Sequence, residues 1–148
     1  MTCVAVRAGI MAADTQSTFS NMKSIVPKLA RFPDMIIGGA GTVTDRNVLI
    51  EWYVQGANRS DPPRFTVYGE KPDVNLLVLY RDGTVRYVDH WLNNREIKEA
   101  FFAIGSGCEA AMGAMYMGAD ARRAVEIAAL VDVNTGGPIE TMFFAEGE

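Results

Sequence analysis

The sequence predicts an α+β protein in which helices cover sheets, and two kinds of observation predict it. Short alternating or apolar runs at residues 2–7, 34–41 and 101–107 have the character of strands. Longer segments at residues 44–56 and 110–129 repeat apolar residues with helical spacing. Because an apolar face of a helix or sheet has to be buried against another element, these segments favour mixed layers of helix and sheet.

The chain begins with a predicted hairpin. Residues 2–7 alternate as a strand, a glycine permits a tight reversal, and residues 10–13 form the partner strand, which ends at Asp14. Alternation places neighbouring side chains on opposite faces of a strand. Cys3 is therefore expected to pack in the core, on the face opposite to Thr2.

A buried strand and a helix are predicted next. The strand is DMIIGGAG at residues 34–41, and the helix starts near Thr44 or Asp45 and stops at Gly56. A glycine turn before a helix also suggests phosphate binding, but the third glycine of a dinucleotide motif and a following GK[ST] are absent. The N–H of Gly41 could equally stabilise an oxyanion.

The middle of the chain is predicted to lack a second helix before the next hairpin. Pro62, Pro63 and Pro72 make an amphipathic helix unfavourable in the segment that follows Gly56. The hairpin itself covers residues 75–89, with its turn at Asp82 and Gly83.

The C-terminal third is predicted as a strand, two helices and a terminal strand. The strand at residues 101–107 leads into a helix that closes at Gly118, and Asp120 caps a second helix. Their alanine-rich faces permit close approach, so an antiparallel pair on one side of a sheet is expected. Taken individually, Ser106 is explained as well by a cap between strand and helix as by a catalytic role, and Thr135 as well by a loop hydroxyl.

Composition indicates one globular domain, residues 1–148, with 49% hydrophobic and 22% charged residues. The net charge of −4 argues against nucleic acid as a partner. Two cysteines and one histidine predict no disulfide framework, no metal site and no cofactor. No apolar run is long enough for a membrane span and no signal peptide is evident, so a cytoplasmic location is expected.

Thr2 is the strongest candidate for chemistry. Removal of Met1, which is usual before a residue as small as threonine, would give Thr2 both a hydroxyl and a free α-amine. The amine can act as the base for the hydroxyl, which is a recurring variant of nucleophilic catalysis. If Met1 is retained, this route is closed.

Five segments in order resemble the proteasome β-subunit family, including the bacterial HslV peptidase. They are the start with Thr2 and AAD, the lysine of IVPKLARF, the turn in IIGGAGTVTD, AIGSG, and VDVNTGG. A lysine between apolar residues could also be an edge-strand lysine with its ammonium in water. The resemblance implies a four-layer αββα sandwich and a threonine-type endopeptidase that cleaves peptides through an acyl ester. The helix content is expected to be reduced relative to the family, because the segment after Gly56 lacks a second helix.

The resemblance also implies roles for individual residues. Thr2 would be the nucleophile, with Asp14 and Lys28 tuning its charge and Gly41 forming the oxyanion hole. Further catalytic residues would be Ser106, Asp132 and Thr135. A substrate pocket with a preference for apolar side chains would be formed by Ser17, Thr18, Val26, Ala30, Gly39, Val43 and Asn47.

The family implies a homo-oligomeric ring, often fed by an ATPase unfoldase, but the missing helix bears on subunit contacts. Two alternatives stay open. One is a catalytically silent structural or assembly subunit with the same fold, for example in a virus particle. The other is hydrolysis of small amides by the broader N-terminal nucleophile superfamily.

Overall fold

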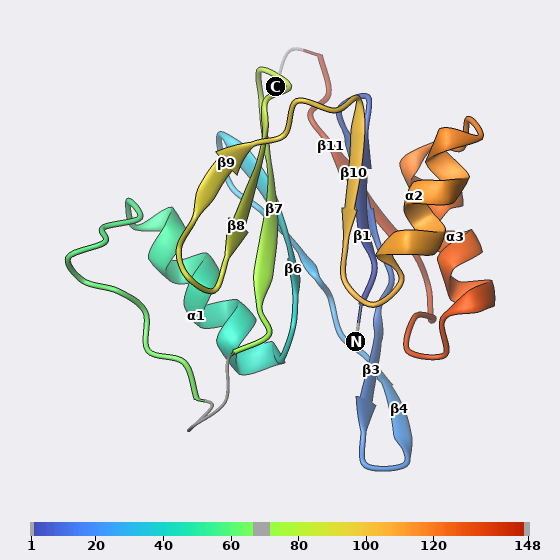
Figure 1. Cartoon of the computed structure of the whole chain (residues 1–148), viewed down its shortest axis with the longest axis horizontal. Coiled ribbons are helices and arrows are strands. Elements are labelled where there is room, and N and C mark those ends of the chain that lie inside the picture. The colour runs from blue at the N-terminus through green and yellow to red at the C-terminus, as the bar shows by residue number, and fades with distance from the viewer. Residues whose placement is uncertain (1, 67–71, 147–148) are drawn as a thin grey trace.

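A computed structural model of the chain describes residues 2–66 and 72–146 (Figure 1). Strands and helices alternate along the chain in blocks, as the sequence predicts. The elements are β1 (Val4–Arg7), β2 (Ile10–Ala13), β3 (Gln16–Phe19), β4 (Met22–Ile25), β5 (Leu29–Arg31), β6 (Met35–Ala40), α1 (Val43–Val54), β7 (Asn75–Tyr80), β8 (Val85–Asp89), β9 (Asn94–Glu96), β10 (Phe101–Ile104), α2 (Cys108–Tyr116), α3 (Ala121–Val131) and β11 (Glu140–Phe143).

The strands form two main antiparallel sheets and a separate hairpin. One sheet has the order β10-β1-β2-β11 and the other the order β5-β6-β7-β8-β9. The hairpin of β3 and β4 projects from the end of the molecule at which the chain begins (Figure 1). This arrangement brings the chain start, the hairpin and the start of α1 to one end of the fold.

The two sheets pack face to face over an apolar core. Val4 and Met11 from one sheet meet Ile36 and Leu77 from the other in this core, and all four are fully buried. Because alternate side chains along β1 point in opposite directions, Ala5 faces the other way. Each sheet therefore has a second apolar face that requires a cover.

Helices cover these second faces. Leu49 and Trp52 of α1 pack with residues of β6 and β7, and Ala124 and Val125 of α3 pack with β1 and β2. Figure 1 shows α1 on one side of the molecule and the α2–α3 pair on the other. Small side chains in α2 and α3 allow the two helices to lie close together, as predicted.

The start of the first helix differs from the prediction. The helix α1 begins at Val43 and is capped by Thr42, which accepts a hydrogen bond from the Asp45 N–H, rather than by Thr44 or Asp45. The sequence TVTD offers two hydroxyls and a carboxyl within four residues, so composition alone does not select the cap.

The segment with Pro62, Pro63 and Pro72 contains no helix at residues 57–66 and 72–74, as predicted; residues 67–71 lie outside the described part of the chain. The strands β3, β4 and β9 were not anticipated. Within the described residues, no helix is long and apolar enough to cross a membrane.

Candidate active site

Thr2 lies at the start of β1 with only 2% of its surface exposed. Its carbonyl accepts a hydrogen bond of 3.2 Å from the Gly107 N–H. Gly105 has a φ of +96°, and a Cβ there would lie 2.1 Å from the Thr2 carbonyl oxygen, so only glycine fits. The turn after β10 therefore holds the main chain of Thr2 in place.

Asp14 and Lys28 form a buried ion pair beside this chain start. Lys28 Nζ lies 2.8 Å from Asp14 Oδ1 and donates a second hydrogen bond of 2.7 Å to the Gln16 carbonyl. The side chain of Lys28 is 3% exposed and that of Asp14 is 0% exposed. Burial lowers the pKa of Lys28 below its ordinary value, while the hydrogen bond to Asp14 opposes that shift. Lys28 is thus not the edge-strand lysine that the alternative interpretation describes.

Main-chain donors complete the surroundings of Asp14. Its Oδ1 accepts a hydrogen bond of 3.0 Å from the Cys3 N–H, and its Oδ2 accepts one of 3.1 Å from the Gly136 N–H. A buried carboxylate is stable only with such partners. Asp14 therefore ties the residue after Thr2 to the loop that follows α3.

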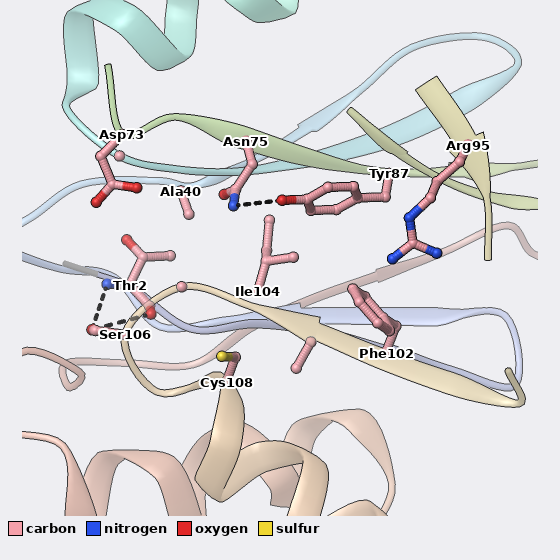
Figure 2. A pocket seen from close by; sticks show the side chains of 13 residues that line it. Thr2, Ala40, Asp73, Asn75, Tyr87, Arg95, Phe102, Ile104, Ser106 and Cys108 are labelled. Atoms are coloured by element: carbon pink, nitrogen blue, oxygen red, sulfur yellow. Dashed lines mark hydrogen bonds between the residues drawn. The ribbon is translucent and has the colours of Figure 1, made fainter. Parts of the chain in front are cut away.

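A second, more exposed network reaches the main-chain nitrogen of Thr2. The Thr2 N–H donates to Ser106 Oγ at 3.2 Å (Figure 2), and Ser106 Oγ donates to Asp132 Oδ2 at 2.5 Å. Thr135 Oγ1 donates to the same carboxylate oxygen at 2.7 Å. Burial disfavours the charged form of Asp132, but hydrogen bonds from Ser106, Thr135 and the Asn134 N–H hold its pKa below the ordinary value.

Cys3 does not belong to this site. Its side chain is fully buried among residues of α2 and α3, on the opposite face from Thr2, as predicted. Burial, with a further contribution from the charge of Asp14, raises the pKa of Cys3 to about 12. A thiol with so high a pKa is a poor nucleophile at neutral pH.

Two cavities flank Thr2, and Gly41 lines both. The larger, of about 470 Å³, lies between the ends of the two sheets (Figure 2). The smaller, of about 410 Å³, lies between the β3–β4 hairpin and α1. Gly41 has a φ of +115°, and a Cβ there would lie 2.2 Å from the Asp73 carbonyl oxygen, so this wall also requires glycine.

Only some of the predicted substrate-binding residues line a cavity beside Thr2. Those that line the smaller cavity are Ser17, Thr18, Val26 and Val43. Those that line neither of the two cavities are Ala30, Gly39 and Asn47.

Several residues that sequence reasoning missed line the two cavities. Arg46 lines the smaller cavity, and Asn75, Tyr87, Arg95 and Phe102 line the larger. No local motif marks them, because they converge only when the two sheets and α1 pack. In the described part of the chain, no three His, Cys, Asp or Glu side chains are grouped as a metal site would require.

The fold is that of the HslV-like N-terminal nucleophile hydrolases. No protein-family model and no curated protein matches the sequence. Among solved structures, Thiobacillus denitrificans BPH is 20% identical and matches with a TM-score of 0.70 over 99% of this chain and 100% of that chain. The same protein in complex with epoxomicin is 21% identical, with a TM-score of 0.72 over 97% and 98% of the two chains. Eukaryotic HslV from Trypanosoma brucei is 23% identical, with a TM-score of 0.69 over 97% and 100%.

Proposed function

We propose that the protein is an N-terminal threonine endopeptidase that hydrolyses peptide bonds through an acyl-ester intermediate. The observation that carries the proposal is the hydrogen bond from the Thr2 main-chain nitrogen to Ser106, beside a cavity that Thr2 shares with the buried cation Lys28. The residue that carries a hydroxyl and an amine position therefore lines the same cavity as a buried, positively charged residue. The mechanism requires that Thr2 carries a free α-amine.

In the first step, Thr2 Oγ1 adds to the carbonyl carbon of the substrate amide, and its proton passes to the Thr2 α-amine directly or through a water held by Ser106. The tetrahedral intermediate collapses as the C–N bond breaks, and the amine proton passes to the leaving nitrogen. Water then adds to the Thr2 ester and releases the acid. The hydroxyl and the amine are restored for the next cycle.

Other residues adjust the energies of these steps. The positive charge of Lys28 lowers the pKa of the Thr2 hydroxyl and favours a neutral amine. Asp132 faces the amine through Ser106, so it stabilises the ammonium that forms during attack. The Gly41 N–H is assigned to the oxyanion, where loss of one donor typically costs about 2.7 to 4 kcal/mol.

The proposal includes the four-layer αββα arrangement and the assembly of the protein. Helices on the outer faces of two packed sheets support the four-layer description, with helix content reduced after Gly56. By its resemblance to HslV, we assign the protein to a homo-oligomeric ring in the cytoplasm, with an ATPase unfoldase as a possible partner. Enclosure in a ring would keep an unspecific peptidase away from other proteins.

The test is the intact mass of the purified protein before and after a peptide epoxyketone, a reagent that requires both the hydroxyl and the amine of an N-terminal threonine. We expect a chain that begins at Thr2 and gains the mass of one inhibitor. Thr2→Ala removes the hydroxyl and keeps the rest of the site, so it should gain no mass. The epoxomicin complex of Thiobacillus denitrificans BPH makes this reagent class a reasonable choice.

Two results would contradict the proposal. A mature chain that still carries Met1 and gains no mass would favour a catalytically silent structural subunit with this fold. Labelling together with hydrolysis of small amides but not of peptides would favour the broader N-terminal nucleophile chemistry. Either result can be read from the same preparation.

A further inference from the structure

Arg46 occupies an unusual place for an arginine near the start of a helix. It lies in the first turn of α1 and is 4% exposed. A Cβ at Gly39 would lie 2.3 Å from Arg46 Cγ and 2.6 Å from its Cδ. The absence of a side chain at Gly39 therefore makes the space in which the aliphatic part of Arg46 lies.

Arg46 lines the smaller cavity, and a hydrogen bond holds its guanidinium beside residues of that cavity. Its Nη2 donates a hydrogen bond of 3.3 Å to the carbonyl of Pro27, and both neighbours of Pro27, Val26 and Lys28, line that cavity. Thr2 and Arg46 thus line the same space of about 410 Å³. Burial lowers the pKa of Arg46, but a guanidinium remains charged in proteins at any physiological pH.

No carboxylate of the described residues forms an ion pair with Arg46. The nearby cation Lys28 differs, because Asp14 and the Gln16 carbonyl accept its hydrogen bonds. Asp73 also lines the cavity, but it is exposed to solvent and lines the larger cavity as well. A buried charge without an opposite charge is costly, so a ligand that brings a carboxylate to this wall would be favoured.

The rest of the lining suits a short aliphatic stem. Val26, Val43 and Phe19 contribute apolar surface to the cavity. An acidic side chain would place its methylene groups on this surface and its carboxylate on the guanidinium, whose planar fork can bind a carboxylate with two hydrogen bonds.

We propose that this cavity selects peptides with an acidic side chain on the acyl side of the cleaved bond, and that Arg46 binds its carboxylate. The inference rests on the proposed threonine chemistry and names its substrate class. It replaces the apolar preference that the small residues in the sequence suggest, because Arg46 lines the cavity and Ala30 and Gly39 do not.

The experiment compares three tripeptide epoxyketones that differ only in the residue next to the ketone: Glu, its neutral isostere Gln, and Leu. The rate at which each adds its mass to Thr2 is measured at pH 7.5 on the assembled native protein. We expect the Glu probe to react at least about tenfold faster than the Gln probe, as is typical when a hydrogen-bonded charge pair forms.

Matched variants separate the charge of Arg46 from its packing. Arg46→Met keeps the aliphatic stem over Gly39 and removes the charge, so the rate ratio of Glu to Gln should fall to about one or below. Arg46→Lys keeps a charge but loses the fork, so an intermediate ratio is expected. Arg123→Met removes an equally positive charge from the exposed surface of α3 and should leave the ratio unchanged.

The outcomes distinguish the two proposals. Labelling by all three probes with Gln or Leu at least as fast as Glu would overturn the acidic preference and leave the threonine chemistry standing. No labelling by any probe would overturn the threonine chemistry and, with it, this inference. If Arg46→Met fails to fold, the ratio in the wild-type protein and in Arg46→Lys still decides the question.

Discussion

The two polar networks around Thr2 differ in how they are held. The pair of Asp14 and Lys28 is buried, and main-chain groups of three separate segments complete its hydrogen bonds. In the second network, Ser106, Thr135 and the Asn134 N–H donate to the Asp132 carboxylate; Ser106 is exposed, Asp132 is half-buried and Thr135 is buried. One network is enclosed in the core, and the other reaches the solvent at Ser106.

From this difference in burial we expect the two networks to have different roles. A charge held in the core is shielded from water and does not reorient, so it can supply a constant electrostatic field. A hydroxyl at the surface, such as that of Ser106, can exchange protons and hold a water, which proton transfer requires. We therefore expect substitutions in the buried pair to reduce both the free energy of unfolding and the reactivity of Thr2. Substitution of Ser106 in the second network should reduce mainly the reactivity of Thr2.

The largest effect is expected from Lys28→Met. The substitution leaves the Asp14 carboxylate buried without its cation, so the free energy of unfolding in urea should fall by about 3 to 5 kcal/mol. Labelling of Thr2 by an epoxyketone should also be lost. Lys98→Met is the matched control, because Lys98 forms an exposed ion pair with Glu96, and its loss should leave the free energy of unfolding nearly unchanged. Equal effects of the two substitutions would contradict the comparison.

Ser106→Ala is expected to separate reactivity from stability. The labelling rate should fall about 100-fold, because the hydroxyl that bonds the Thr2 nitrogen is removed. The free energy of unfolding should change by less than about 1 kcal/mol, since the side chain is exposed. Ser60→Ala, at an exposed loop position, serves as the control and should change neither quantity. A large loss of stability with Ser106→Ala would place this residue with the buried pair instead.

The pH dependence of stability should reveal Asp132. Its pKa in the folded protein is lowered, so it binds fewer protons than in the unfolded chain, and its contribution is fully present above the ordinary value of 3.8. The contribution is lost as the pH falls through the lower folded pKa. The stability difference between the wild type and Asp132→Asn should therefore shrink between pH 5 and pH 2, measured by urea unfolding at each pH. A difference that stays constant would show that the charge of Asp132 is not involved.

The smallest expected effect concerns the thiol next to Thr2. Burial raises the pKa of both thiols, to about 12 for Cys3, but Cys3 is fully buried, whereas Cys108 is half-buried and lines the larger cavity. Iodoacetamide at pH 8 should modify Cys108 at least about tenfold faster than Cys3 in the native protein, as peptide mass spectrometry would show. In urea the two rates should converge. Fast native modification of Cys3 would contradict its assignment to the core.

Much of the fold could be predicted because the main strands and helices carry strong periodic patterns. The first hairpin, the hairpin turned at Asp82 and Gly83, and the helix capped by Asp120 lie where the pattern places them. The hairpin of β3 and β4 was missed because it is largely exposed and packs on no sheet, so it has no apolar alternation to detect.

The candidate site was predictable in part for a similar reason. The resemblance names Asp14 and Lys28, and the structure shows them paired. Arg46 was missed because a single arginine in the first turn of a helix is ordinarily a solvated residue. Its burial becomes evident only in the folded structure, where the aliphatic part of Arg46 in α1 packs over Gly39 in β6.

The glycine at position 105 bears on how the proposed activity would be controlled. Because the turn after β10 contacts the carbonyl of Thr2, the main chain of Thr2 is held from its C-terminal side, by contacts with residues 105 and 107. Under the proposed mechanism, maturation would then be a purely chemical event: cutting the bond before Thr2 would uncover an amine without a refolding step. Such a protein would switch on as fast as the bond is cut, and its latency would reside in one covalent bond rather than in a closed conformation.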